Sequence, residues 1–493
     1  MDHMNIRYIL YLCSRVLLIL ALLLLLPLAV SVYYRDGCIP AFLIPIGIMM
    51  TLGLLFGIKK PPRGTLFARE GFAVVTLIWV LFSVLGALPF LISGAIPSFT
   101  DAFFETVSGF TTTGASILPA VEGLPKSILF WRQFMNWIGG MGVLALALAL
   151  APLDKDQHKK QDRSVGSDVY IIRAESPGPM FGKLVAKLRF NVQILYIIYA
   201  CMTLVTIIFL LLGGMDLFDS ICHAFAAAGT GGFSVRNASI GAYNHAYFDW
   251  VLSIAIMLFG INFNIYYFLL TKNFLNILKS EELRWYLIII GASTGLIACN
   301  IFSTYGSVST SIRYAFFQVT SIITTTGFST VDFNLWPTFS KGILLLLMFI
   351  GACASSTGGG LKVSRCIILV KTAIKEIRYH LNPREVRTIR CDGNHVENAV
   401  VTNVSSYFVV YMLVFAASTF LLSLDPDHSL ETCFSAVAAC LNNIGPGLDG
   451  VGPMSNFSHF SDFSKWLLSA DMLLGRLELF PMLALFHPAA WRK

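Results

Sequence analysis

Apolar runs long enough to cross a membrane alternate with short polar segments along the whole chain. The first two runs are Val16 to Tyr34 and Cys38 to Ile58, and the others lie at 71–93, 133–153, 190–214, 250–271, 285–302, 342–361, 398–424 and 463–486. A hydrocarbon core about 30 Å thick needs about 20 apolar residues in a helix. The pattern therefore predicts ten membrane-spanning helices. A cleaved signal peptide is the alternative for the first run, but a second span follows it almost at once.

A shorter apolar segment that ends in glycine lies between alternate pairs of these spans. The segment DAFFETVSGFTTTG, which ends at Gly114, aligns without a gap with segments that end at Gly232, Gly327 and Gly445. About ten helical residues are too few to cross a bilayer, so each segment must re-enter from one side. Non-helical backbone at that depth requires surrounding protein or a water-filled cavity. Four repeats of span, short helix, loop and span around one axis predict a pore.

We therefore expect an all-α polytopic membrane protein with four pseudo-repeated pore units and an extra pair of transmembrane helices at the N-terminus. The expected boundaries are 1–65 for the N-terminal pair, 66–153 for the first unit, 154–272 for a cytoplasmic linker and the second unit, 273–378 for the third unit and 379–493 for the fourth. Most Lys and Arg residues lie in alternate connecting segments, which places both termini in the cytoplasm.

The composition excludes an ordinary soluble domain, since 56% of the residues are hydrophobic, 13% are charged and the mean hydropathy is +0.71. The net charge of +7 follows the cytoplasmic loops and does not indicate nucleic-acid binding. The ten cysteines are scattered singly, without zinc-site spacing, and are interpreted as buried small residues.

The four glycine-ending loops carry the candidate chemistry. A cation in a membrane needs its hydration shell replaced, and rings of backbone carbonyls do this in potassium channels. The loops contain no charged residue, which favours a weakly hydrated monovalent cation over calcium or an anion. Asp101 and Asp219 suit the N-terminal ends of the short helices, whereas Arg313 precedes the third short helix and does not fit. The alternative is that TTTG and its relatives are small-residue packing points between helices.

The loop sequences TTTGA, GTGGFS, TTTGFS and NNIGPG together resemble the Trk/Ktr/HKT superfamily of potassium transporters. The segments RAESPGP at 173–179 and GRLELFP at 475–481, with the extra N-terminal spans, resemble its TrkH type in particular. The resemblance implies potassium sites formed chiefly by the backbone carbonyls of Thr112, Thr113, Thr230, Gly231, Thr325, Thr326, Asn443 and Ile444.

The same resemblance implies a transporter of the bacterial inner membrane and not an enzyme. Its metal is potassium, the transported ion, and this chain would hold no organic cofactor. The expected partners are a second copy of the chain, in a homodimer, and a cytosolic ring of TrkA-type subunits that bind nucleotide, besides membrane lipid. The basic stretches 154–187 and 378–397 are the available docking surfaces, although positive-inside topology explains their charge equally well.

A second glycine-rich segment, Gly351 to Lys362, interrupts the predicted second span of the third unit. Its glycines, with Gly358, Gly359 and Gly360 in a row, disfavour helix, so we expect two half-helices joined by a flexible loop that obstructs the pore. TrkH-like proteins are built this way. The alternative is a close helix crossing at the glycines.

Arg476 lies in the last span, where charges are functional candidates by default. By the resemblance it faces the segment 351–362 and adds to the gate. The alternative is an ion pair with Asp471 or Glu478 that serves assembly.

Two other functions stay open at this stage. An ion-coupled secondary symporter uses broken helices too, but normally with inverted repeats, and these four copies run in one direction. A polytopic membrane enzyme would need converging ionisable residues, and His223 stands alone in its segment.

Overall fold

The fold is described from a computed structural model, which covers residues 6–57, 68–142, 188–384 and 388–486. The described chain is mostly helical. The helices are α1 (Ile6–Leu23), α2 (Leu25–Tyr34), α3 (Ile39–Gly57), α4 (Ala68–Ile92), α5 (Phe99–Phe110), α6 (Lys126–Gly140), α9 (Leu188–Leu212), α10 (Leu217–Gly229), α11 (Ala246–Phe259), α12 (Phe263–Leu270), α13 (Phe274–Lys279), α14 (Glu281–Tyr305), α15 (Val308–Ile323), α16 (Thr338–Ile350), α17 (Val363–Leu381), α18 (Asn398–Leu422), α19 (Leu430–Leu441), α20 (Asp462–Leu477) and α21 (Leu479–Phe486).

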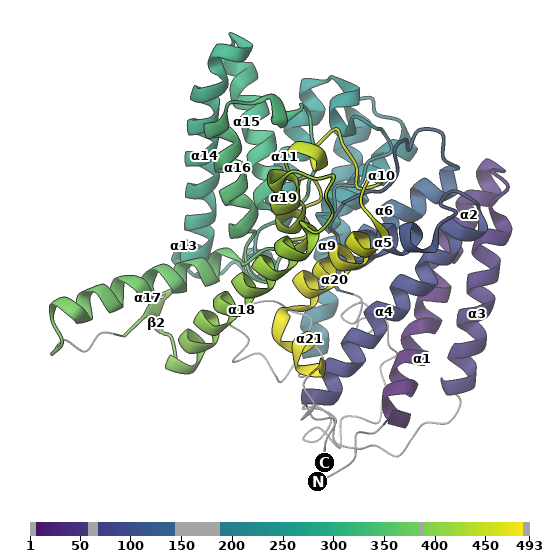
Figure 1. Cartoon of the computed structure of the whole chain (residues 1–493), viewed down its shortest axis with the longest axis horizontal. Helices are drawn as coiled ribbons and strands as arrows, with labels where there is room; N and C mark the ends of the chain where they lie inside the picture. The colour runs from purple at the N-terminus through teal and green to yellow at the C-terminus, as the bar shows by residue number, and fades with distance from the viewer. Residues whose placement is uncertain (1–5, 58–67, 143–187, 385–387, 487–493) are drawn as a thin grey trace.

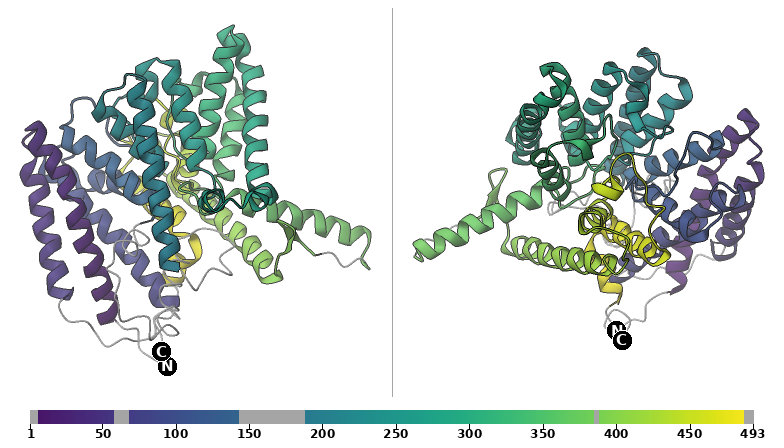
Figure 2. Two further views of the ribbon diagram at one scale, coloured as in Figure 1. Left: turned by 180° about the vertical axis from the view of Figure 1, so that it is seen from behind. Right: turned by 45° about the horizontal axis from the view of Figure 1, so that its top comes forward.

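The helices form four groups around a common centre. The groups are α4 to α6, α9 to α11, α14 to α16 and α18 to α20, and the right-hand view of Figure 2 shows them in that order around the middle of the molecule. Helices α1 to α3 pack outside the first group, against α4 and α6 (Figure 1). The architecture expected from the repeat is therefore present, with the N-terminal helices as an addition to one side.

Each group contains one short buried helix, as the repeat predicts. These pore helices are α5, α10, α15 and α19, and their lengths are 12, 13, 16 and 12 residues. Three of them begin with a serine that accepts a hydrogen bond from the first turn, namely Ser98, Ser307 and Ser429, and Asp216 does the same for α10. The N-terminal ends are thus satisfied locally, and all four C-terminal ends lead into the glycine loops.

The outward faces of the long helices are apolar, as lipid contact requires. Leu212, Leu346 and Phe420 are examples, with large exposed fractions of 75%, 67% and 70%. Six helices of the described chain are long and apolar enough to cross a membrane, or seven if the bent pair α11 and α12 counts as one span. The predicted run 133–153 is only partly described, because α6 ends at Gly140 and residues 143–153 lie outside the described ranges.

The predicted unbroken span at 250–271 is wrong. Helix α11 ends at Phe259 and α12 begins at Phe263 with its axis turned by 89°. Asn262 begins the new helix and accepts a hydrogen bond from the N–H of Asn264, at 3.0 Å. Gly260 and Asn262 mark this break, but the surrounding apolar residues conceal it in a hydropathy pattern.

The start of the third pore helix also differs from the expectation. Helix α15 begins at Val308, five residues before Arg313, so Arg313 lies within the helix and not before it. Its side chain pairs with Asp249 of α11 at 3.4 Å. This ion pair explains why a positive charge is tolerated there.

A single long helix and a small hairpin project from the bundle. Figures 1 and 2 show α17 extending sideways. The hairpin pairs β1 (Arg390–Cys391) with β2 (Asn394–His395), with Arg390 opposite His395. Asp392 and Gly393 both have positive φ, 52° and 78°, as a type I′ turn requires. The proposed docking segment 154–187 and the motif at 173–179 lie outside the described residues.

Candidate ion filter and intramembrane loop

The four pore helices end in the same backbone turn. The residue two positions before each loop glycine has a left-handed conformation, and these residues are Thr112 (φ 56°), Thr230 (53°), Thr325 (58°) and Asn443 (56°). The next N–H in each case donates to the carbonyl five residues back, at 2.8 to 2.9 Å, which is the Schellman ending of a helix. Threonine rarely adopts this conformation, so its repetition indicates that the surroundings impose it.

The loop glycines form a closed ring with their neighbours. A Cβ atom on Gly114 would overlap the carbonyl oxygen of Gly231 in the second unit. The same relation continues around the ring, with Gly232 against Thr326 O, Gly327 against Ile444 O and Gly445 against Thr113 O. These glycines also have positive φ, between 65° and 99°. We call these four glycines and the residues before them the filter ring; glycine is required there for both its conformation and its missing side chain.

Hydroxyl groups brace the two TTTG loops from within. In the first unit the hydroxyls of Thr111 and Thr113 lie 2.8 Å apart, and in the third unit those of Thr324 and Thr326 lie 2.7 Å apart. All four side chains are fully buried. The first and third threonines of TTTG therefore hold the loop and leave the backbone carbonyls available for other partners.

The fourth loop, which has Asn in place of Thr, is joined to the first. The Asn443 amide donates to Thr113 Oγ1 and to Met472 O, at 2.9 Å each. A second amide, Asn442, accepts from Tyr411 Oη at 2.9 Å. These bonds replace the hydroxyl pair of the TTTG loops, which accounts for the divergent sequence of this loop.

Polar bonds also join neighbouring units outside the filter ring. The second and third units share bonds of Gly241 N to Ser329 O (3.1 Å) and Ser329 N to Ser239 Oγ (3.3 Å). The fourth and first units share Phe457 N to Ser116 O (2.8 Å). These segments surround a cavity of about 140 Å³ that opens onto the ring.

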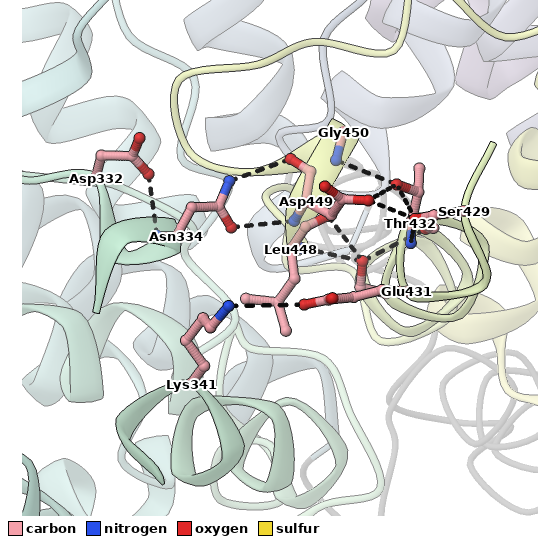
Figure 3. Close-up of polar contacts among 10 residues, drawn as sticks. Asp332, Asn334, Lys341, Ser429, Glu431, Thr432, Leu448, Asp449 and Gly450 are labelled. Carbon is pink, nitrogen blue, oxygen red and sulfur yellow. Dashed lines mark hydrogen bonds and ion pairs between the residues drawn. The ribbon is translucent and has the colours of Figure 1, made fainter. Parts of the chain in front are cut away.

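The third and fourth units meet through Asn334 and Asp449. Figure 3 shows the Asn334 amide facing the Asp449 backbone, to which it donates at 3.1 Å and from which it accepts at 3.0 Å. The Asp449 carboxylate in turn accepts hydrogen bonds from Ser429 and Thr432 at the start of α19. One amide thus ties the third unit to the start of the fourth pore helix.

The glycine segment between α16 and α17 breaks the helix where the sequence places the break. Helix α16 ends at Ile350 and α17 starts at Val363. Gly351 and Gly360, at the two ends of the segment, have φ of 75° and 78° and lie against each other. We call residues 351–362 the intramembrane loop. A close crossing of two intact helices is excluded as the reason for these glycines.

The intramembrane loop lies directly against the filter ring. The N–H of Gly359 donates to Thr325 Oγ1 at 2.6 Å, and a Cβ atom on Gly359 would overlap Asn442 O. A Cβ atom on Gly358 would lie 2.7 Å from Thr324 O. The Lys362 ammonium, which is buried, donates back to Gly358 O within the loop. The loop therefore closes one side of the ring where the third and fourth units meet.

The break between α11 and α12 holds the other side of the intramembrane loop. Cys353 N donates to Gly260 O, and Phe263 N donates to Ser355 O, at 3.1 Å each. Glu282 of α14, 7% exposed, accepts from Ala354 N at 2.7 Å and from Ser364 N at 3.2 Å. One carboxylate thus binds both the loop and the first turn of α17, which follows it.

Arg476 connects the intramembrane loop to the first unit. Its guanidinium donates to Thr357 O at 2.8 Å and to Gly140 O at 2.7 Å. The carboxylates near it are occupied elsewhere, since Glu478 pairs with Arg365 at 2.5 Å and Asp471 accepts from Ser418 at 2.8 Å. The contact expected between Arg476 and the loop is present in the structure.

The residues that sequence reasoning selected thus gather at one place, with the candidate filter residues in the ring and the candidate gate residues against it. Sequence reasoning missed Glu282 and the break at Gly260. The doublet Glu281-Glu282 before an apolar run is a helix-start signal, and this explanation conceals the role of Glu282 in binding the loop. It also overlooked Glu105 and Arg132, which form a fully buried ion pair beside the loops. The sequence signal that could have identified Glu105 and Arg132 is that both are charged residues within membrane segments.

Comparison with known proteins gives a consistent result. Residues 41–493 match the TrkH family, described as a cation transport protein. The Trk system potassium uptake protein TrkH of Escherichia coli K12 is 36% identical, with 95% of this chain and 96% of that protein covered. The protein of the same name from Vibrio parahaemolyticus is 34% identical and is covered completely, as is 99% of this chain.

A solved structure has the same fold. The crystal structure of the potassium transporter TrkH from Vibrio parahaemolyticus superposes with a TM-score of 0.88 at 33% identity. The match covers 99% of this chain and 100% of that one.

Proposed function

The chain belongs to the TrkH family of cation transport proteins, and from that premise we propose that it takes up potassium ions through the filter ring, with the intramembrane loop as the gate. The observation that carries the proposal is the closed ring of glycines and carbonyls. The relatives named above are potassium uptake proteins, and this chain covers nearly their whole length.

The ion sites are the backbone carbonyls before the four glycines. The carbonyls of Thr113, Gly231, Thr326 and Ile444 each lie against the glycine of the next unit, so they face a common centre. No ionised side chain belongs to the ring. Such neutral oxygen ligands suit a large, weakly hydrated monovalent cation. The four pore helices also direct the negative ends of their dipoles toward this centre.

The gate is the intramembrane loop together with Arg476. The loop lies against the third and fourth filter segments through Gly359 and is fixed to the first unit through Arg476. A positive charge on this path adds an electrostatic barrier for cations. Passage of an ion requires that the loop leave its bonds to the ring.

The cellular setting is a multi-pass protein of the bacterial inner membrane with both termini in the cytoplasm. The relatives are named as parts of a Trk system, which supports action with further components. We place a homodimer and a cytosolic nucleotide-binding TrkA-type ring in this role, on the strength of the family resemblance. The basic helix α17 and the hairpin, which project from the bundle, are the docking surfaces among the described residues (Figure 2).

Uptake of rubidium and sodium into liposomes that contain the purified chain tests the function. We expect rubidium uptake above that of empty liposomes, a preference over sodium, and no need for an imposed proton or sodium gradient. The variant Gly232→Ala places a methyl group on Thr326 O and should abolish the preference. Gly295→Ala, in α14 with open space around it, is the matched control and should behave as wild type. Uptake that required an imposed ion gradient would instead identify an ion-coupled symporter.

A further inference from the structure

One position of the pore helices carries a buried polar side chain in three of the four units. It lies nine residues before the loop glycine and holds Glu105, His223 and Gln318, with Ala436 in the fourth unit. All three polar side chains are 0% exposed. Each of them forms a hydrogen bond with the segment of its own loop that starts two residues after the glycine, which we call the outer limb. We call the shared position of these side chains on the pore helices the brace position.

The brace of the first unit is charged. Glu105 accepts hydrogen bonds from Ser116 Oγ at 3.1 Å and from Ile117 N at 3.0 Å. Ser116 lies two residues after Gly114. The carboxylate therefore fixes the outer limb of the first loop, where the chain leaves the filter ring. A charged acceptor makes these hydrogen bonds stronger than those to a neutral acceptor.

The brace of the second unit is a neutral imidazole. His223 Nδ1 lies 2.8 Å from Asp219 O, which can only accept, so this nitrogen carries the proton. Nε2 is then the acceptor for Ser234 Oγ at 3.0 Å. Ser234 lies two residues after Gly232, so its place in the loop corresponds to that of Ser116.

The third and fourth units have no charged side chain at the brace position. Gln318 donates to Thr330 Oγ1 at 3.4 Å, close to the limit for a hydrogen bond, and its Oε1 has no hydrogen-bond partner among the described residues. In the fourth unit Ser435, beside Ala436, exchanges hydrogen bonds with the backbone of Leu448 at 3.0 and 3.1 Å. Both units thus rely on neutral groups.

Arg132 of α6 links the first two braces. Its Nε donates to Glu105 Oε1 at 2.8 Å and its Nη1 donates to Ser234 O at 3.2 Å. The guanidinium also lies over the Phe233 ring, 4.2 Å from its centroid. With exposed fractions of 1% and 0%, Arg132 and Glu105 form a buried ion pair. Such a pair fixes geometry strictly, because loss of either partner leaves a buried charge.

We propose that the Glu105–Arg132 pair is a positioning element that sets the preference of the filter ring for potassium over sodium. The inference rests on the proposed function. The pair holds the outer limbs of the first two loops at one distance, and these limbs begin two residues from the ring glycines. A displaced limb moves the carbonyls of Thr113 and Gly231. Discrimination between two cations depends on the placement and the field of such carbonyls.

The test is the ratio of rubidium to sodium uptake in liposomes for Glu105→Gln and for the double variant Glu105→Gln/Arg132→Gln. Loss of a charged hydrogen bond predicts a ratio lower by about tenfold in Glu105→Gln. The double variant removes both charges, so it should recover thermal stability without recovering the ratio. Asp249→Asn is the matched control, because it breaks another ion pair, that of the buried Asp249 with Arg313, away from the loops, and should keep the ratio.

The possible outcomes test the inference separately from the proposed function on which it rests. If the wild-type chain takes up rubidium and both Glu105 variants keep its ratio of rubidium to sodium uptake, the inference is overturned. It is also overturned if the double variant regains the ratio that Glu105→Gln alone has lost. If Glu105→Gln does not accumulate, Ser116→Ala keeps the ion pair and removes the hydrogen bonds of Ser116 Oγ with Glu105, Arg132 and the N–H of Leu118, and an unchanged ratio there has the same meaning. A wild-type chain without uptake would overturn the proposed function, and the inference with it.

Discussion

Replacement of Arg476 by Met is expected to raise ion flux in the absence of any regulatory partner. The substitution keeps an unbranched apolar stem at this position and removes the charge and the donors. Two of the contacts, with Gly139 O and Gly140 O, are to the end of α6, and the bond to Thr357 O is to the intramembrane loop. That bond, at 2.8 Å, is therefore the part of the interaction that opening must break.

The size of the effect follows from this one bond. A hydrogen bond from a charged donor contributes about 1.5 to 3 kcal/mol net. If it exists only in the closed state, its removal raises the ratio of open to closed molecules by about 10- to 150-fold. Basal flux should rise by this factor until opening ceases to limit it. Arg476→Lys keeps the charge but has fewer donors, so it should give an intermediate flux.

The assay is rubidium uptake into liposomes with equal amounts of reconstituted protein. Ser469→Ala is the matched control, since Ser469 lies on the same helix and bonds only to Lys465 O within it. We expect wild-type flux from this control. Basal flux of Arg476→Met at the wild-type level, in protein of unchanged thermal stability, would show that the contact does not hold the gate.

Three further changes have expected outcomes. Glu282→Gln weakens the bonds to the intramembrane loop and to the first turn of α17, and it should raise basal flux about fivefold. Glu281→Gln should not, because the Glu281 carboxylate pairs outside the loop with a lysine at 2.6 Å. Asn334→Ala removes both bonds to the Asp449 backbone and should lower the free energy of unfolding by about 1 to 2 kcal/mol, measured by thermal unfolding in detergent. Hydrogen bonds from Ser429 and Thr432 lower the pKa of the Asp449 carboxyl below its ordinary 3.8. The stabilising contribution of this carboxylate is therefore complete above pH 3.8 and is lost as the pH falls further. The unfolding temperature of Asp449→Asn should fall less on acidification than that of wild type.

The repeat in the sequence identified four loops that share one backbone geometry, because aligned positions report on backbone conformation. Thr112, Thr230, Thr325 and Asn443 occupy one aligned position, and all four have left-handed φ between 53° and 58°. No single loop reveals this, since threonine and asparagine differ in their conformational preferences. Four aligned copies compensate for the weakness of each signal.

Contacts between distant segments could not be predicted in this way. The partners Glu105 and Arg132 are 27 residues apart, and Glu282 is 72 residues from Ala354. Periodicity and local propensity say nothing about which buried charge meets which N–H. The break at Gly260 was missed for a different reason, because one glycine within a strongly apolar run has little influence on a hydropathy pattern.

The attachment of the intramembrane loop to the α11–α12 break has a consequence for how the proposed gate can change during evolution. Cys353 N and Phe263 N make these bonds with main-chain atoms, which every residue except proline supplies. Ordinary substitutions therefore leave the resting position of the loop intact. The side chains of Glu282 and Arg476 are different, because each can be exchanged in a single step. Substitutions at these two positions can thus make opening of the loop easier or harder in related chains, while the main-chain bonds keep its closed position.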